Sequence, residues 1–468
     1  MRLPMNPAVT GLTLSGIRRF TALAAQTPGC VKLTLGEPEF DTPLPIRQAA
    51  QQALEQSDTH YPPNNGRAEL LEALSAFSEK QGLHYAPEEF VVTCGATEAL
   101  LCALSGVVDV GDEVLVPIPA FGLYESLIGL CRGVYKPVDT EPYGFQLSED
   151  ALNAAVSERT KAIILTSPNN PTGCVYTKES LDAVAELVRR TGIYVICDDV
   201  YWQLCYTDSF GRFAALYPDL RENIIVVESF SKPYAMTGWR LGWLAADAPV
   251  KQQLQKVHQY SVVSVTSFSQ NACITALESD VSAMRQSYRQ RRDYVYQRLC
   301  KMGLPVNKPE GAFYIFPCIR RFGMSSEEFC TRLIQEGGLA LVPGSCFGAE
   351  GYVRLSYCCA QDQLEGGRAR RGAFLNSPTK KKQKNTADPA GPMIGAGRFC
   401  ICIKREDRKM KIRRGRSSGP ALRRWPAHSG CRPDAAACLP DNPPRRCGNR
   451  SSWLPGPARC GGPAGEWR

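Results

Sequence analysis

The sequence predicts an α/β fold: a large domain built on a mostly parallel sheet, followed by a smaller α+β domain. Short apolar runs rich in β-branched residues recur along the chain, and segments with helical spacing separate them. A polar residue follows directly after most of these runs. Alternating strands and helices form parallel sheets, so we expect the polar residues to gather along one sheet edge.

The N-terminal part of the chain favours irregular structure before the first long helix. Residues 1 to about 35 are expected to form an extended arm, with a helix starting near Phe20. Residues 33–45 are rich in proline and contain Gly36, so they are expected to form a loop. Residues 46–56 have helical spacing, and the segment HYPPNNG at 60–66 interrupts it.

The central part of the chain alternates between strand and helix patterns. Strands are expected at residues 90–93, 113–117, 162–166, 194–197 and 224–227. Residues 96–107 and 178–190 have helical spacing and are read as crossovers between strands. From residue 250 the pattern becomes helical, with a long helix through 285–302. The smaller α+β unit follows, with a strand at VRLS, 353–356.

The turn after the strand at 90–93 is suited to an anion. Gly95, Ala96 and Thr97 stand between a strand and a helix, where free backbone N–H groups and the positive end of a helix dipole converge. Gly95 permits close approach. The alternative is a simple strand-to-helix turn.

The strand at 224–227 leads into the segment SFSKPYAMTGWRLG, residues 229–242. Its lysine, Lys232, lies near Ser229 and Arg240. These groups suit a phosphate-bearing aldehyde, because the lysine can bind the carbonyl as a Schiff base while Ser229 and Arg240 hold the phosphate. The alternative is a surface loop with ordinary charges.

The charge of the chain is divided between two regions. The net charge is +9, but residues 378–468 contain 21 Lys+Arg and 6 Asp+Glu, so residues 1–377 are mildly acidic. Residues 378–468 are also rich in proline and glycine and are predicted to be a disordered basic tail. The predicted organisation is an N-terminal arm at 1–45, a large domain at 46–280, a small domain at 281–377 and the tail at 378–468.

Cysteine use and apolar runs indicate a soluble cytoplasmic protein. Fourteen of the 20 cysteines are scattered through residues 1–377, without the pattern of a disulfide framework. The six in the tail lack the paired spacing of a zinc module, so no metal site is expected. We find no signal peptide and no run long enough to cross a membrane.

The segment at 229–242 resembles the pyridoxal-phosphate lysine motif of class I/II aminotransferases, the aspartate aminotransferase superfamily of fold type I. Other landmarks of that family stand in family order between residues 36 and 357: LGEPEFDTP, YPPNNG, GATEAL, PNNPTG, DDVY and VRLSY. The resemblance implies a seven-stranded, mostly parallel sheet sandwiched by helices. It also implies a homodimer, with Tyr61 reaching the cofactor phosphate of the neighbouring subunit.

The resemblance assigns further roles to single residues. Phe121 would stack on the pyridine ring, with Tyr124 nearby. Asn170 and Tyr201 would bind the phenolic oxygen of the cofactor, and Asp198 would keep the pyridine nitrogen protonated. For the substrate, Gly36 would offer a backbone contact and Arg354 would clamp the α-carboxylate; from the sequence alone Gly36 could equally serve only a turn.

The expected activity is therefore transfer of an amino group from an L-amino acid to a 2-oxo acid, with 2-oxoglutarate as acceptor. Lys232 would carry the proton during a ping-pong reaction. The donor is expected to be aromatic or neutral, or the specificity broad. Phe121, Tyr124, Trp202 and Phe313 are candidates for an apolar pocket or plain core; a second, side-chain-reading cation is not placed, and Arg18, Arg19 and Lys32 are candidates only by proximity.

Two other functions stay open. A C–S β-lyase would use the same lysine, aspartate and arginine, and would release pyruvate and sulfide from cysteine or cystathionine. A non-catalytic regulator would bind nucleic acid through the basic tail in a salt-dependent way. This second alternative is disfavoured, because no DNA-binding domain precedes the fold.

Overall fold

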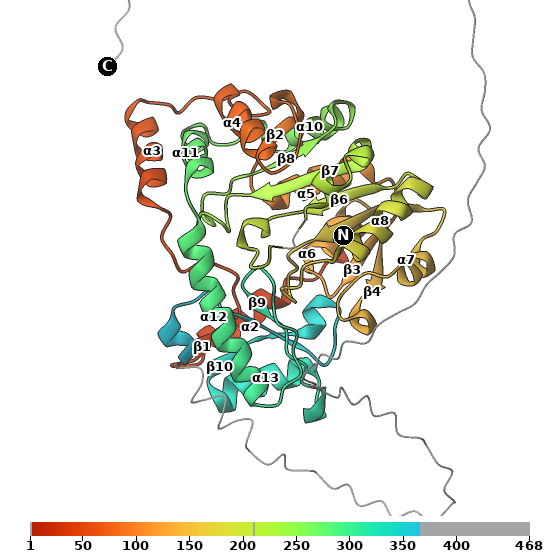
Figure 1. Ribbon diagram of the computed structural model, residues 1–468, viewed down its shortest axis with the longest axis vertical. Coiled ribbons are helices and arrows are strands. Elements are labelled where there is room, and N and C mark those ends of the chain that lie inside the picture. Colours follow the sequence, from red (N-terminus) through yellow and green to blue (C-terminus); the bar gives the residue numbers. More distant parts are fainter. Residues whose placement is uncertain (1, 209–210, 366–468) are drawn as a thin grey trace, which may run out of the picture. The chain divides into compact units, whose positions relative to one another are not determined.

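The apolar runs of the sequence form a seven-stranded sheet in the computed structural model (Figure 1), which describes residues 2–208 and 211–365. The strands, in spatial order, are β2 (Phe90–Thr93), β8 (Gly242–Ala246), β7 (Ile224–Ser229), β6 (Tyr194–Asp198), β5 (Thr160–Thr166), β3 (Glu113–Ile118) and β4 (Val134–Asp139). Neighbouring strands are parallel except β8, which is antiparallel to β7 and β2. The predicted fold class is confirmed.

Apart from edge strand β4, the strands of this sheet are buried on both faces, which explains why they are apolar without alternation. Along β7, Ile224 and Val226 enter one core, while Ile225 and Val227 enter the core on the opposite face. The first core is covered by α3 (Leu44–Glu55), α4 (Ala68–Glu79), α7 (Glu149–Ala155), α8 (Lys178–Thr191), α9 (Phe213–Leu216) and α11 (Ser267–Glu278). The second is covered by α5 (Ala96–Val107), α6 (Leu123–Leu130) and α10 (Ala248–Val262).

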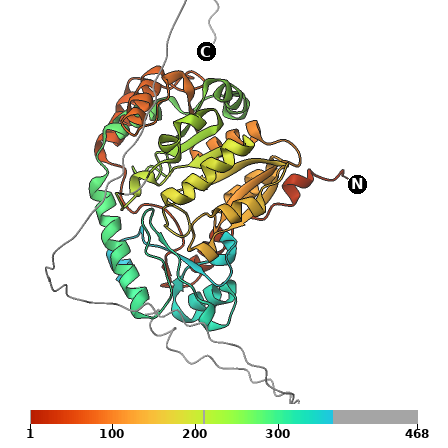
Figure 2. The same ribbon diagram turned by 45° about the vertical axis from the view of Figure 1, so that its right-hand side comes forward.

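A separate core lies under two smaller sheets. The strands are β1 (Val31–Lys32) with β10 (Leu339–Ala340), and β9 (Tyr314–Ile315), β12 (Val353–Ser356) and β11 (Val342–Pro343). The helices α2 (Gly16–Ala25), α12 (Ser282–Lys301) and α13 (Ser326–Gly337) pack on this core. Figure 2 shows α12 running beside the large sheet toward the smaller ones.

The N-terminal arm differs from its prediction. It holds two helices, α1 (Pro7–Thr10) and α2, and α2 begins four residues before Phe20. Phe20 and Ala24, one turn apart, bury this helix in the third core, so tertiary packing decides its extent. The domain limits at 45/46 and 280/281 stay predictions, and the basic tail at 378–468 lies outside the described residues.

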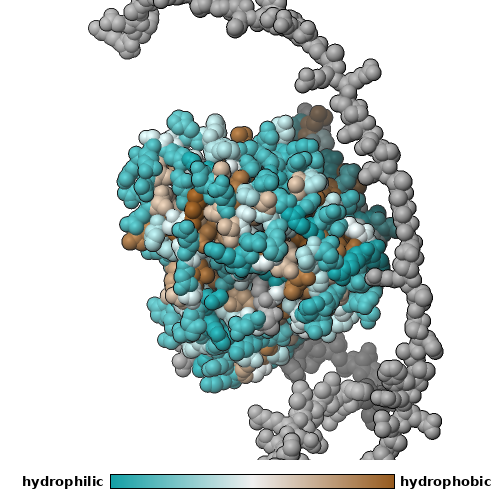
Figure 3. All heavy atoms as spheres, turned by 45° about the horizontal axis from the view of Figure 1, so that its top comes forward, coloured by the Kyte–Doolittle hydropathy of each residue, from teal (hydrophilic) through white to brown (hydrophobic). Residues whose placement is uncertain are grey.

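The surface seen in Figure 3 is mostly hydrophilic, with separate apolar patches. Within the described residues no helix combines the length and the apolar content that crossing a membrane requires.

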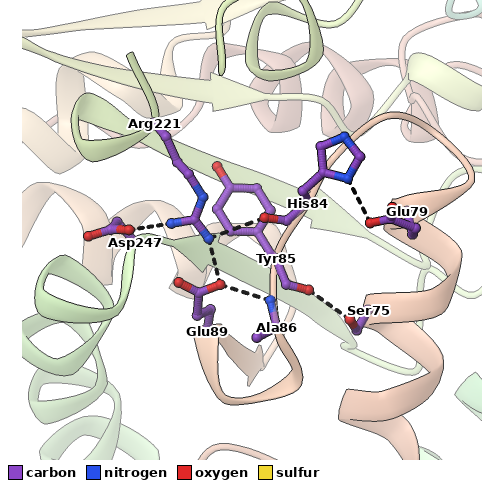
Figure 4. Close-up of polar contacts among 8 residues, drawn as sticks. All are labelled: Ser75, Glu79, His84, Tyr85, Ala86, Glu89, Arg221 and Asp247. Carbon is purple, nitrogen blue, oxygen red and sulfur yellow. Dashed lines mark hydrogen bonds and ion pairs between the residues drawn. The ribbon is translucent and has the colours of Figure 1, made fainter. Parts of the chain in front are cut away.

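Arg221 forms ion pairs that connect edge strand β2 to its neighbours in the sheet (Figure 4). This arginine lies just before β7, and its guanidinium contacts Glu89, directly before β2, and Asp247, directly after β8. It also lies over the Tyr85 ring, 4.7 Å from the centroid. One cation thus joins the ends of three strands.

We expect Arg221→Met to lower the free energy of unfolding by about 2 kcal/mol, because two carboxylates lose a charged hydrogen-bond donor. Urea unfolding measures the change. Lys178→Met is the control, since its pair with Asp182 is exposed (59% and 50%) and its loss should change the free energy of unfolding far less than the loss of Arg221. Equal changes in the two variants would contradict this assignment.

Candidate active site

A cavity of about 820 Å³ opens where the carboxyl ends of the central strands meet the smaller sheets. Its volume lies in the upper part of the range that small-molecule sites span, roughly 300–1,000 Å³. The predicted site residues that line it are Gly36, Ala96, Thr97, Phe121, Asn170, Asp198, Tyr201, Ser229, Lys232, Arg240 and Arg354. Segments distant in sequence therefore converge on one space.

The predicted anion-binding turn, residues 95–97, is called the anion seat below; Ala96 and Thr97 line the cavity. Gly95 caps α5 with a φ of 75°, and a Cβ there would fall 2.7 Å from an Arg240 guanidinium nitrogen. Arg240 donates to the carbonyl of Thr237 at 3.3 Å. The Ser229 hydroxyl, nearby, accepts from the backbone N–H of Ser231 at 3.0 Å. A helix N-terminus, a guanidinium and a hydroxyl face the same place, so this part of the cavity favours an anion.

Asp198 ends strand β6 and is buried. Its Oδ2 accepts a hydrogen bond from the Tyr124 hydroxyl at 2.6 Å, and that hydroxyl also contacts Thr166 at 2.7 Å. The other carboxylate oxygen, Oδ1, has no hydrogen-bond partner among the described residues. Burial raises the pKa of Asp198 to about 6, and the bond from Tyr124 opposes that shift. The carboxylate is thus held in place with one oxygen still able to accept.

Lys232 lies in the turn after β7, not in a helix, as Pro233 and Gly238 predicted. Its ammonium donates to the carbonyl of Gly36 at 2.8 Å. Burial lowers the pKa of Lys232 to about 8. An amine that is easily deprotonated near neutral pH is a nucleophile, and this one faces the same cavity as the anion seat.

Arg354 lies on β12 and is only 1% exposed. It donates to Asn170 Oδ1 at 2.9 Å and to the carbonyl of Thr34 at 2.5 Å, and it stacks 4.4 Å from the centroid of the Tyr314 ring. Its Nε has no hydrogen-bond partner among the described residues. A buried guanidinium with spare donor capacity is suited to a carboxylate.

Sequence reasoning did not assign a role to Tyr314. Its hydroxyl lies 2.8 Å from that of Tyr201, and a Cβ at Gly36 would fall 1.8 Å from it. Gly36 is therefore required by close packing, beyond any turn. The motif GAFY at 311–314 was the available signal, but an aromatic residue on a short strand is usually core.

A buried ionic cluster lies behind the strand ends and was also missed. Arg212 contacts both Asp199 and Glu228, and the Trp202 indole donates to Glu228 at 2.8 Å. Burial raises the pKa of Glu228 to about 7. Asp199 and Glu228 adjoin Asp198 and Ser229 in sequence, so one arginine fixes the ends of β6 and β7 together.

His258 contacts residues next to the anion seat. This fully buried ring contacts Glu98 Oε1 at 2.7 Å through Nδ1 and the carbonyl of Asn64 at 2.8 Å through Nε2. Both ring nitrogens therefore have a hydrogen-bond partner. Glu98 also accepts from the backbone N–H of Cys94, which directly precedes Gly95. His258 thereby ties the 60–66 loop to the anion seat.

Tyr61 does not line the cavity. It lies on the same 60–66 loop and is 88% exposed. Its predicted contact across a dimer interface stays a prediction.

We expect His258→Phe to lower the free energy of unfolding by about 3 kcal/mol, because the buried Glu98 carboxylate and the Asn64 carbonyl each lose a hydrogen-bond partner. Denaturant unfolding measures the change. His84→Phe is the matched control, since His84 and its partner Glu79 are exposed (67% and 62%) and their pair should be worth under about 1 kcal/mol. A small change at His258, matching that at His84, would show that the buried pair does not stabilise the fold.

The lowered pKa of Lys232 predicts an unusual pH profile for its reactivity. In the ligand-free protein, acetylation of Lys232 by acetic anhydride should rise through a midpoint near pH 8, whereas an ordinary lysine titrates near about 10.4. Peptide mass spectrometry over a pH series measures this, and Lys232→Arg identifies the labelled peptide. A midpoint above pH 10 would contradict the desolvation of this amine.

Comparison with known proteins agrees with this geometry. Residues 28–369 match the family model for aminotransferase class I and II. The chain is 40% identical over 378 residues to a probable N-acetyl-LL-diaminopimelate aminotransferase of Bacillus subtilis, covering 79% of this chain and 95% of that one. It is 39% identical to aromatic-amino-acid aminotransferase 2 of Thermococcus litoralis, covering 75% and 93%.

A solved structure supports the same assignment. Aspartate aminotransferase from Thermus thermophilus with maleate superposes with a TM-score of 0.76 at 34% identity, covering 80% of this chain and all of that one. The family match spans most of the chain and includes every predicted site residue. The protein belongs to the class I and II aminotransferases.

Proposed function

We propose that this aminotransferase moves the α-amino group of an L-amino acid to 2-oxoglutarate by a ping-pong mechanism, with pyridoxal 5′-phosphate bound to Lys232 as a Schiff base. The observation that carries the proposal is one cavity that holds a half-buried lysine, a buried carboxylate, an anion seat and a buried arginine. Each of these groups matches one part of the cofactor or the substrate.

The cavity fits this cofactor on two independent grounds. Asp198 Oδ1 is buried and lacks a partner, so it can accept from a protonated pyridine nitrogen. The missing side chain at Gly95 leaves room beside Arg240, where a phosphate would receive the guanidinium and the N–H groups of α5. When bound, the protonated ring supplies an acceptor for the electrons released from the substrate Cα–H bond.

The remaining steps fall to side chains of this chain. Lys232 would take the proton from the substrate Cα as general base and would later return it as general acid. Asn170 and Tyr201 hold the phenolic oxygen, and Asn170 is itself oriented by Arg354. Arg354 binds the α-carboxylate, which positions Cα relative to the lysine.

The side chains that line the cavity also indicate which amino donors it can accept. Apolar side chains of Leu35, Leu100, Phe121 and Leu123 face the cavity, which supports neutral or aromatic donors. Of the other predicted pocket residues, Tyr124 lines the cavity but bonds Asp198, Phe313 lies in the core, and Trp202 belongs to the ionic cluster. Relatives of this chain carry names with different donors, so a broad donor specificity is part of this proposal.

A homodimer and a cytoplasmic location belong to the same proposal. Tyr61 and Tyr260 are 88% and 86% exposed, and Asn64 of the Tyr61 loop donates to the carbonyl of Val263, beside α10. Exposed aromatic residues on adjoining segments suit a protein interface. The buried cysteines Cys102, Cys197 and Cys273 are free thiols, which suits a reducing compartment.

A donor-by-acceptor screen of the protein loaded with pyridoxal phosphate tests this function, and borohydride trapping with peptide mapping tests the lysine. We expect amino transfer to 2-oxoglutarate and a reduced adduct on Lys232, both lost in Lys232→Ala. Pyruvate and sulfide from cysteine without any 2-oxo acid requirement would favour the β-lyase instead. An adduct on another lysine would overturn the assignment of Lys232.

We expect Asp198→Asn to lower kcat by about a thousandfold. A carboxylate about 4 Å from the ring cation contributes about 4 kcal/mol at an effective dielectric near 20, which corresponds to about three powers of ten. Steady-state kinetics measure kcat, and absorbance confirms that the cofactor is still bound. A kcat within tenfold of the parent, at full cofactor loading, would show that this charge is not needed.

A further inference from the structure

One wall of the cavity is a face of helix α2. Ser15, Arg18, Ala22 and Ala25 line the cavity at spacings of three and four residues, as one face of a helix does. The opposite face buries Phe20 and Ala24 in the core beneath the smaller sheets. The orientation of the helix is therefore set by packing, and Arg18 lies on the cavity side.

Arg18 is the charged lining residue that the proposed function leaves without a role. Asp198, Lys232, Arg240 and Arg354 are assigned to the cofactor or to the α-carboxylate. The other charged lining residue, Glu37, accepts a hydrogen bond from Thr237 at 2.7 Å. Arg18 is exposed at the cavity wall, and no carboxylate of residues 2–208 and 211–365 forms an ion pair with it.

The other two cations considered from the sequence are placed differently. Arg19, the next residue on α2, forms an ion pair with Glu327 at 2.5 Å. Lys32 lies on β1 and does not line the cavity. Among the three candidates, Arg18 is thus the one that lines the cavity.

Hydrogen bonds connect Arg18's helix to the arginine that holds the α-carboxylate. The hydroxyl of Thr21 lies 2.8 Å from that of Thr34, and the Thr34 carbonyl accepts from Arg354. Arg18 is three residues before Thr21, a rise of about 4.5 Å along the helix. Two guanidinium groups therefore belong to one continuous wall, Arg354 buried and Arg18 toward solvent.

We propose that Arg18 binds the side-chain carboxylate of dicarboxylic amino acids and 2-oxo acids whose α-carboxylate is held by Arg354. The assignment rests on the proposed function and adds the residue that reads the substrate side chain. Because Arg18 is long and exposed, it can remain in water when the substrate side chain is neutral. One cavity can then accept a dicarboxylic acceptor and an apolar donor in alternate half-reactions.

The kinetic test compares Arg18→Met with Arg19→Met, each keeping an unbranched apolar stem. We expect Arg18→Met to lower kcat/KM for glutamate and 2-oxoglutarate about tenfold or more, the range for a charged hydrogen bond, and to leave half-reaction rates with alanine or phenylalanine within about twofold. Arg19→Met should change neither class. Equal losses for both classes, or no loss for dicarboxylates, would overturn the proposal.

A binding measurement gives a second readout that needs no turnover. Calorimetry of the cofactor-loaded protein should show that succinate binds more tightly than butanoate, that Arg18→Met removes most of this difference, and that added salt weakens it. If the succinate preference survives in Arg18→Met, another cation reads the distal carboxylate. Failure of the wild type to transfer any amino group would instead refute the proposed function.

Discussion

The placement of charged groups away from water, at the carboxyl ends of parallel strands, is the constraint on which this site depends. Asp198 is buried where β6 ends, and a single hydroxyl, that of Tyr124, satisfies one of its oxygens. A buried carboxylate without full compensation costs stability, and the shift of the Asp198 pKa to about 6 reflects that cost. Strands β5 and β7 lie on either side of β6 and are packed on both faces, and this packing offsets the loss of stability.

The same constraint explains the ionic cluster behind the site. Asp199 and Glu228 share one arginine, Arg212, and all three are buried. The cluster fixes the position of site residues, since Asp199 is next to Asp198 and Glu228 is next to Ser229, and both of these neighbours line the cavity. Breaking the cluster would leave a buried charge unpaired, which is strongly destabilising. The ends of β6 and β7 are therefore held in fixed positions relative to each other. His258 has the corresponding role beneath the anion seat, where it joins Glu98 to the 60–66 loop.

The sequence was sufficient for five of the seven strands of the large sheet and for most of the residues in the cavity. Strands buried on both faces are continuous apolar runs, so β2 was predicted with its observed bounds, and β5, β6 and β7 to within two residues. Strands β4 and β8 were not predicted. The edge strand β4 is largely exposed and contains Lys136 and Pro137, and in β8 Gly242 and the two alanines at its end carry a weak strand signal. Tyr314 and the cavity face of α2 were missed for a different reason. Their importance arises from contacts across hundreds of residues, such as the approach of Tyr314 to Gly36, which no local pattern encodes.

The groups assigned to the cofactor and those assigned to the substrate come from different parts of the fold. The groups assigned to the cofactor come from strand ends of the large sheet, whose positions are fixed by two cores and by the Arg212 cluster. The groups proposed to bind the substrate, Arg354 and Arg18 on the exposed side of α2, come from the smaller sheets and the N-terminal segment. A change on the exposed face of α2 does not reach the third core, since Phe20 and Ala24 on the opposite face are the residues buried there, and α2 contributes no residue to the two cores of the large sheet. Specificity can therefore vary while the chemistry is retained, which is consistent with relatives of about 40% identity that carry aspartate, aromatic and diaminopimelate names.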